Sequence, residues 1–133
     1  MKIAIDLIGT ENQSGTKTFN ENFFNTIQNL TNKNNDIEYI LFITENLKKL
    51  YIEKNNNIKL VVKKNLFGNP MLKIIWMQLI LPFELLYLRV DRIYSPMNYC
   101  PVICKFLKIR VFLCIHTILP WYFYNLMPGS FIK

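Results

Sequence analysis

His116 is the one histidine of the chain, and it directly follows an apolar run, residues 111–115, of the kind found in buried strands. An imidazole titrates near neutral pH, so a histidine at a strand end could hydrogen-bond a hydroxyl or shuttle a proton. A lone histidine is more often structural or merely exposed, and that alternative stays open. His116 is therefore the candidate catalytic residue.

A glycine-containing segment, residues 9–18 (G-T-E-N-Q-S-G-T-K-T), is the second place where chemistry could occur. Its backbone N–H groups, next to the start of a helix, could hold a phosphate. We take Ser14, Gly15 and Thr16 as the phosphate-facing residues. G-x-G-x-x-G is absent, and a P-loop would need Lys17 directly after the second glycine. Two alternatives stay open. The segment is a turn that binds no ligand, or the chain is a small P-loop-like nucleotide-binding protein.

The third candidate is the segment S-P-M-N-Y-C-P, residues 95–101, which follows another short apolar run. In open α/β sheets, ligands bind beyond the carboxyl ends of the strands, where the strand order reverses. We therefore expect this segment, the glycine segment and His116 to lie along one edge of a parallel sheet.

The cysteines do not indicate a metal site. Cys100, Cys104 and Cys114 lie near His116 in the sequence, but their spacing matches no common zinc pattern. We expect buried, inert thiols and neither a metal nor another cofactor. Three is an odd number of cysteines, which argues against a disulfide framework and for a reducing compartment.

The elements that must position these residues begin with five apolar runs bounded by turn residues. They predict strands at residues 2–8, 37–44, 58–62, 92–95 and 111–115. Strands that alternate with helices indicate βαβ units, right-handed crossovers and a parallel sheet. The predicted fold class is α/β, a Rossmann-like domain with helices on both faces of the sheet.

Two helical patterns connect these strands. The first places apolar residues on one helix face, with Thr18 and Glu21 as a capping box, and its stripe is Phe19, Phe23, Ile27 and Leu30. The second begins at Pro70 and continues to Leu88, with Pro82 expected to kink or divide it. This second helix is apolar nearly all round, so we expect it to be buried on several sides, packed on a partner domain or laid on a membrane.

Composition limits the classes of partner. With 133 residues, 51% of them hydrophobic, the chain has the size and apolar content of one folded domain. A net charge of +7 suits phosphates, anionic lipid or nucleic acid, but most of it lies in Lys- and Asn-rich stretches typical of a solvated surface. No basic segment alternates with aromatic residues as a nucleic-acid groove would, so we expect no nucleic-acid partner.

The N-terminus does not resemble a secretory signal, because Asp6 interrupts its apolar run. The longest apolar stretch, residues 74–88, is shorter than the roughly 20 residues that span a bilayer, and it carries Gln78, Pro82 and Glu84. We expect a cytoplasmic protein, with peripheral contact with an anionic membrane at its inner face as an open possibility.

Five motifs in order give the chain a resemblance to a known family. They are M-K-I-A-I-D-L-I-G at residue 1, S-G-T at 14, W-M-Q-L-I-L-P at 76, I-Y-S-P-M-N-Y at 93 and I-H-T-I-L-P at 115. Together they resemble the N-terminal half of the family 4 glycosyltransferases, which have the GT-B fold of two Rossmann-like domains. The resemblance implies a retaining transferase of polysaccharide biosynthesis that moves a sugar from a nucleotide-sugar donor to a glycan or lipid-linked acceptor.

The resemblance also implies roles for individual residues. Gly15 matches the glycine loop that faces the donor phosphates and the acceptor, and His116 matches the cleft histidine. Asn98 and Tyr99 match the acceptor-side loop. The chain departs from the family at Thr117, where relatives commonly have aspartate, and at Gly15, which lacks the usual neighbouring glycine.

In this family the nucleotide-sugar is held mainly by the C-terminal domain. We expect residues 1–133 to be an N-terminal, acceptor-side domain of a larger protein, with the donor-binding domain absent and little or no transfer by this part alone. A non-catalytic remnant or a membrane-adhering binding module is the alternative.

Overall fold

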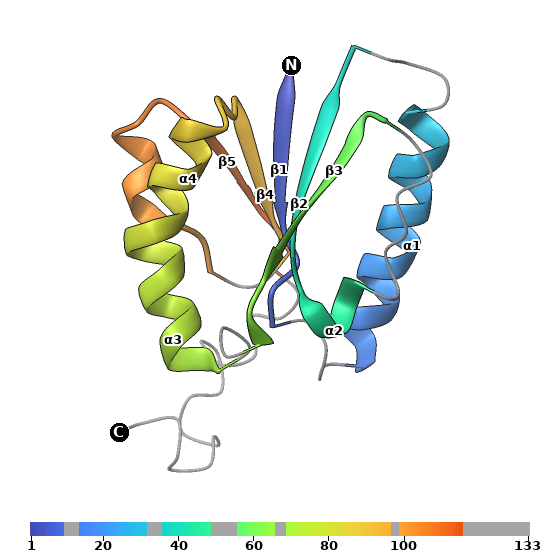
Figure 1. Cartoon of the computed structure of the whole chain (residues 1–133), viewed down its shortest axis with the longest axis horizontal. Coiled ribbons are helices and arrows are strands. Elements are labelled where there is room, and N and C mark those ends of the chain that lie inside the picture. Colours follow the sequence, from blue (N-terminus) through green and yellow to red (C-terminus); the bar gives the residue numbers. More distant parts are fainter. Residues whose placement is uncertain (10–13, 32–35, 49–55, 66–68, 97–98, 116–133) are drawn as a thin grey trace.

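The computed structural model describes residues 1–9, 14–31, 36–48, 56–65, 69–96 and 99–115, without the side chains of residues 14–17 and 70. They form an α/β fold around one five-stranded, all-parallel sheet (Figure 1). The sheet has the order β3-β2-β1-β4-β5, and its strands are β1 (Lys2–Asp6), β2 (Glu38–Thr44), β3 (Ile58–Lys63), β4 (Arg92–Ser95) and β5 (Arg110–Leu113). The predicted Rossmann-like class is confirmed.

Helices cover both faces of the sheet (Figure 1). On one face lie α1 (Ser14–Thr31) and the short α2 (Glu45–Lys48). On the other face, α3 (Pro70–Ile75), the π-helical turn η2 (Trp76–Ile80) and α4 (Leu81–Tyr87) form one long segment, with the 3-10 helix η3 (Val102–Lys105) beside it. This is the arrangement expected from parallel strands joined by helical crossovers.

The core has two halves because successive side chains of a strand point to opposite faces. Ala4 of β1 packs with the α3–α4 segment, whereas its neighbour Ile5 packs with α1. In the same way, β2 sends Phe42 to the first half and Ile43 to the second. Double burial explains why the inner strands are near-continuous apolar runs in the sequence.

The predicted capping box of α1 is wrong, and its predicted apolar stripe is right at Ile27 and in part at Phe23 but wrong at Phe19 and Leu30. The helix begins at Ser14, before Thr18, so Thr18 cannot cap it. The residues it buries are Asn20, Phe24, Ile27 and Thr31.

Of the predicted stripe, Phe19 and Leu30 are 41% and 52% exposed. Phe23 lies at the border, where its ring stacks on Phe19 and packs 4.8 Å from the Tyr94 ring, measured between centroids. The stripe followed the aromatic side chains, but the helix turns a face with two polar residues onto the sheet.

The second predicted helix is divided as expected. Asn69 begins it, since its Oδ1 accepts a hydrogen bond from the Met71 N–H at 3.0 Å. Before Pro82 the helix widens into the π turn, in which the Leu81 N–H donates to the Trp76 carbonyl. A proline has no N–H to donate to the preceding turn, which accounts for a rearrangement at this place.

Strand ends differ slightly from the predicted ones. β1 pairs only as far as Asp6, because the chain turns at Gly9, and β5 ends at Leu113 rather than at residue 115. After Pro101 the chain forms the four-residue 3-10 turn η3.

No helix among the residues that the structure describes is long and apolar enough to cross a membrane.

Candidate functional site

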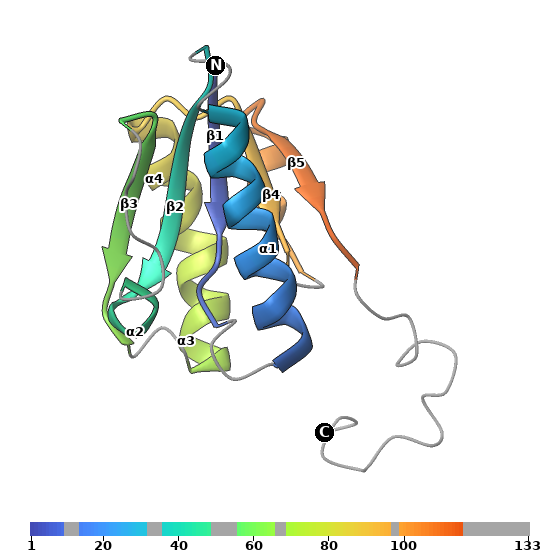
Figure 2. The same ribbon diagram turned by 90° about the vertical axis from the view of Figure 1, so that its right-hand side faces the viewer.

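The strand order reverses beside β1, which pairs with β2 on one side and with β4 on the other. β5 continues the sheet beyond β4. All five strands are parallel, so β1, β4 and β5 end at the same edge, at Asp6, Ser95 and Leu113. Figure 2 shows α1 beginning at this edge. An open parallel sheet binds its ligands at such a reversal point, and we take this edge as the candidate site.

Gly9 turns the chain after β1. Its φ of 82° is left-handed, which glycine adopts without strain. A Cβ at this position would lie 3.3 Å from Cδ and 3.6 Å from Nζ of Lys73. Both the backbone conformation and the packing beneath it therefore favour glycine here.

A buried ion pair lies beneath this turn. Lys73 of α3 is 1% exposed and Asp6 is fully buried. The Lys73 Nζ lies 3.4 Å from Asp6 Oδ2 and donates a hydrogen bond to the Ile8 carbonyl. Asp6 Oδ1 accepts a hydrogen bond from the Ile8 N–H at 3.1 Å. The pair thus fixes both polar backbone groups of Ile8, just before the turn.

Burial at this position disfavours the charged form of the Asp6 carboxyl group. Burial raises the pKa of Asp6 above its ordinary value, and the Lys73 ammonium opposes part of that rise. A buried ion pair is costly to break, because removal of one partner leaves the other charge unpaired. The pair therefore makes the position of the turn strongly dependent on both residues.

Lys73 also reaches the segment after β4. Its Nζ lies 5.2 Å from the centroid of the Tyr99 ring, a cation–π distance. The Ser95 hydroxyl donates to the Tyr99 carbonyl at 2.7 Å. One ammonium group thus touches the turn after β1 and the tyrosine that follows β4.

Gln78 of the π turn holds the same segment from the other side. Its Nε2 donates to the Cys100 carbonyl, and its Oε1 accepts from the Val102 N–H, both at 3.0 Å. The side chain amide therefore supports the chain between Tyr99 and η3.

Of the residues predicted from the sequence, Tyr99 is half-buried and lies at this edge. Ser14, Gly15 and Thr16 form the first turn of α1 rather than part of a loop, which corrects the prediction of a glycine loop through these residues. Their side chains are outside the described residues, and so are three further candidates: Asn98, His116 and Thr117.

Sequence reasoning missed the residues that hold the edge together. Asp6, Lys73 and Gln78 are each a polar interruption of an apolar run, and that interruption was the available signal. The interruptions did not show which residues these side chains contact, because the contacting residues are far apart in the sequence. Asn20 was missed as well: it is fully buried in α1, and neither of its amide atoms has a hydrogen-bond partner among the residues that the structure describes.

All three cysteines are free thiols, and Cys104 is the buried one. Burial raises the pKa of the Cys104 thiol to about 11. Burial, followed by the hydrogen bond with Cys114, also raises the pKa of Tyr94. Among the described residues, no group of His, Cys, Asp or Glu side chains has the arrangement of a metal site.

Comparison with known proteins gave no matching family model, no similar curated protein and no similar solved structure.

Proposed function

We propose that this chain is the acceptor-side domain of a retaining glycosyltransferase, which moves a sugar from a nucleotide-sugar donor to a glycan or lipid-linked acceptor. The observation that supports this most is the meeting of two segments on Lys73 at the reversal point: the turn at Gly9 and the segment carrying Tyr99. These are the first and fourth of the five motifs that carry the sequence resemblance.

Each group at this edge has a property that suits a phosphorylated sugar. Gly9 turns the chain tightly over Lys73, because a Cβ at this position would lie 3.3 Å from Lys73 Cδ, and this sets the backbone that a ligand would meet. The N-terminus of a helix such as α1 attracts an anion through its first backbone N–H groups and its dipole. Below them, the buried Lys73 is paired with Asp6 and bonded to the Ile8 carbonyl, so it holds the floor of the edge in place.

In this proposal the acceptor lies against Asn98, Tyr99 and Thr117. His116 follows β5 and forms a hydrogen bond with a sugar hydroxyl or moves its proton. The donor is held mainly by a second domain, as the resemblance implies. The protein works in the cytoplasm, at the inner face of the membrane when its acceptor is a lipid.

The second candidate function is a membrane-adhering binding module without catalysis. The observation that favours it is the large exposed apolar surface of the α3–α4 segment. It predicts membrane adhesion without sugar transfer, so the two candidates give different results in the assay below.

The test is transfer of radiolabelled hexose by the protein expressed from its complete reading frame. UDP-, GDP- and ADP-hexoses are offered with a membrane lipid extract and with soluble glycans as acceptors. We expect transfer from one donor, and a loss of about 100-fold or more in His116→Ala, the usual range for an acid–base group. Asn25→Ala, on the exposed side of α1, is the control for folding and purification. Absence of transfer from every donor, or a full rate in His116→Ala, would contradict the proposal.

A further inference from the structure

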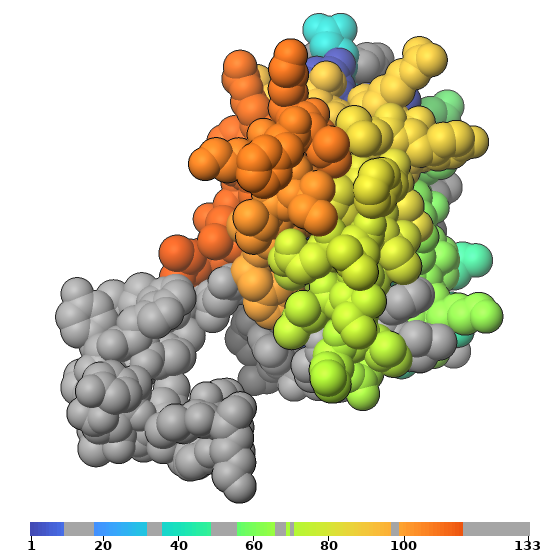
Figure 3. All heavy atoms as spheres, turned by 90° about the vertical axis from the view of Figure 1, so that its left-hand side faces the viewer, coloured from blue at the N-terminus to red at the C-terminus, as the bar shows by residue number. Residues whose placement is uncertain are grey.

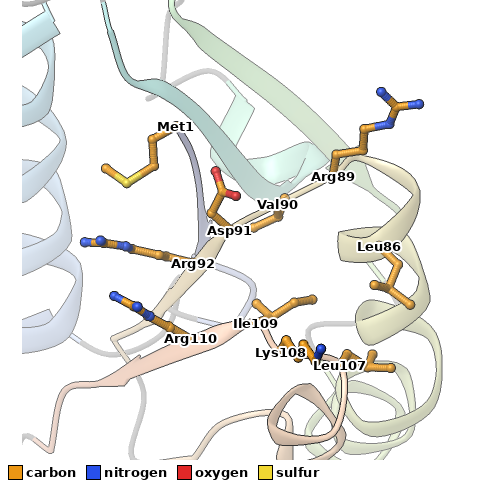
Figure 4. A pocket seen from close by; sticks show the side chains of 10 residues that line it. All are labelled: Met1, Leu86, Arg89, Val90, Asp91, Arg92, Leu107, Lys108, Ile109 and Arg110. Atoms are coloured by element: carbon orange, nitrogen blue, oxygen red, sulfur yellow. The ribbon is translucent and has the colours of Figure 1, made fainter.

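A groove of about 480 Å³ lies at the edge of the sheet where the strands begin, which we call the amino edge. Two turns form it, one between α4 and β4 and the other between η3 and β5. Figure 3 shows the yellow end of α4 and the orange end of η3 next to each other near the top of the molecule, and Figure 4 shows the side chains that line the groove. It has four cations and one carboxylate, and these charged residues are Arg89, Asp91, Arg92, Lys108 and Arg110.

Two arginines face each other across the strands of this groove. Arg92 and Arg110 are the first residues of β4 and β5, and strand pairing places them directly opposite each other. Side chains alternate between the faces of a strand, so Arg92 is on the same face as Tyr94, which packs on the α1 half of the core. In Figure 4 the two arginine side chains extend side by side toward that face. Like charges at directly opposite positions destabilise a sheet, and a bound anion would relieve their repulsion.

The carboxylate of Asp91 does not pair with these arginines. Its Oδ2 accepts a hydrogen bond from the Lys2 backbone N–H at 2.7 Å. Among the described residues, no carboxylate forms an ion pair with Arg92 or Arg110. The Cζ of Arg92 lies 6.0 Å from the centroid of the Phe112 ring, a contact that orients a cation without neutralising it. Within this part of the chain, both guanidinium groups therefore bring unneutralised charge to the groove.

The other two cations occupy positions at which glycine is usual. Arg89 and Lys108 have φ values of 55° and 59°, in the left-handed region that a residue with a side chain adopts only with strain. In both turns the N–H of the next residue donates to a carbonyl five residues earlier, the bonding pattern of a helix end that commonly has glycine. The chain thus has a strained cation in place of glycine at both turns of the groove. Strained residues of this kind cluster at functional sites.

A terminal phosphate fits this arrangement. Two planar guanidinium groups side by side offer paired N–H donors, which phosphate oxygens accept in a bidentate manner. A phosphate monoester has up to two negative charges and three free oxygens on one group. The bridging phosphates of a nucleotide-sugar and the diesters of a nucleic acid carry one charge each, so they fit less well.

The size and the walls of the groove suit a small organic molecule. Its volume is within the range of about 300–1,000 Å³ that is typical of small-molecule sites. The uncharged residues that line it are all apolar: Met1, Leu86, Val90, Leu107 and Ile109. They offer a contact surface to the organic part of an ester.

We propose that this groove binds a small organic phosphate monoester, with the phosphate between Arg92 and Arg110 and the organic part against the apolar wall. Arg89 and Lys108, at the two turns, add positive charge that attracts the ligand. This site goes beyond the proposed function, because the groove and the candidate site are at opposite edges of the sheet. The failure of either proposal leaves the other unchanged.

The test is isothermal titration calorimetry of the full chain at low salt with ribose 5-phosphate and with adenosine 5′-monophosphate. We expect saturable binding of at least one ester and no binding of ribose or adenosine, which lack the phosphate. Arg92→Gln/Arg110→Gln should weaken binding about tenfold or more, because charge-assisted hydrogen bonds are lost. Lys48→Gln/Lys59→Gln removes the same charge from exposed positions elsewhere and should bind like the wild type.

Two further variants test the turns and the shape of the arginines. Arg89→Gly/Lys108→Gly removes two cations together with their backbone strain. It should be at least as stable as the wild type in urea denaturation, yet bind the ester severalfold more weakly. Arg92→Lys/Arg110→Lys keeps the charge without the planar guanidinium and should bind more tightly than Arg92→Gln/Arg110→Gln.

Three results would overturn the proposal. The first is the absence of binding of both esters at low salt. The second is an equal loss in Arg92→Gln/Arg110→Gln and in Lys48→Gln/Lys59→Gln, since binding would then follow net charge alone. The third is binding of a single-stranded oligonucleotide that depends on these arginines, without binding of either ester, which would assign the groove to nucleic acid.

Discussion

Lys73 shows how one residue can organise an edge made by distant parts of the chain. Its ammonium contacts Asp6 of β1 and the carbonyl of Ile8, just after β1, and lies over the ring of Tyr99. Nothing in the local sequence around it indicates those partners. The residue is inside the domain, so its contribution is to the position and stability of the edge.

We expect Lys73→Met to lower the free energy of unfolding by about 3–5 kcal/mol, because it leaves the carboxylate of Asp6 buried and unpaired. Urea denaturation measures the change. Lys64→Met, at an exposed position, should leave stability within about 0.5 kcal/mol. Asp6→Asn/Lys73→Met should recover much of the loss, and a single variant as stable as the wild type would show that the pair is dispensable.

Asp6 also predicts a pH dependence. Its pKa in the folded protein is raised above 3.8, so the folded state holds this proton more tightly than the unfolded chain. Stability that depends on that proton is present below the unfolded pKa and is lost as the pH rises through the folded pKa. The unfolding free energy of the wild type minus that of Asp6→Asn should therefore fall as the pH rises from 3.8. A difference that grows with pH would mean that Lys73 outweighs burial.

Cys104 should be the slowest of the three thiols to react. With a pKa of about 11 and full burial, it forms little thiolate at pH 8, and the thiolate is the nucleophile. Maleimide labelling followed by mass spectrometry of peptides should show Cys104 at least about tenfold slower than Cys100 and Cys114. Equal rates in the folded protein, or a slow thiol other than Cys104, would argue against this packing.

At the scale of elements, the sequence predicts strands better than helix faces. Inner strands are buried on both sides, so their apolar runs are visible without knowing the neighbours. The face of α1 depends on what it packs against, and there the pattern of large aromatic residues was misleading. Phe19 is partly exposed, while Asn20 and Thr31 are buried.

The buried Asn20 of α1 leads to a prediction about stability. In the described part of the chain its buried amide has no hydrogen-bond partner, so Asn20→Leu removes an unsatisfied group and should raise the free energy of unfolding by about 1–2 kcal/mol. Asn25→Leu makes the same replacement at an exposed position of the helix and corrects for helix propensity. Urea denaturation gives the free energy of unfolding of each variant, and the value for Asn20→Leu is compared with that for Asn25→Leu. A destabilised Asn20→Leu would show that the amide has a role in the packing.

At the scale of the molecule, the sheet separates two surfaces. The carboxyl edge holds the turn at Gly9 and the segment with Tyr99, and the amino edge holds a groove lined by Arg89, Asp91, Arg92, Lys108 and Arg110. The sequence predicted the first, because strand ends and their loops can be located from apolar runs. It did not predict the groove, since Arg92 and Arg110 become neighbours only through strand pairing.

The most direct test of the proposed site is hydrogen–deuterium exchange of the protein from its complete reading frame, with and without the nucleotide-sugar that supports transfer. We predict slower exchange at the carboxyl edge, in peptides containing Gly9, Tyr99 and His116, and unchanged exchange at the amino edge around Arg89 and Lys108. Slower exchange at the amino edge alone, or at neither edge with any of the nucleotide-sugars, would contradict the assignment of the carboxyl edge as the sugar-transfer site.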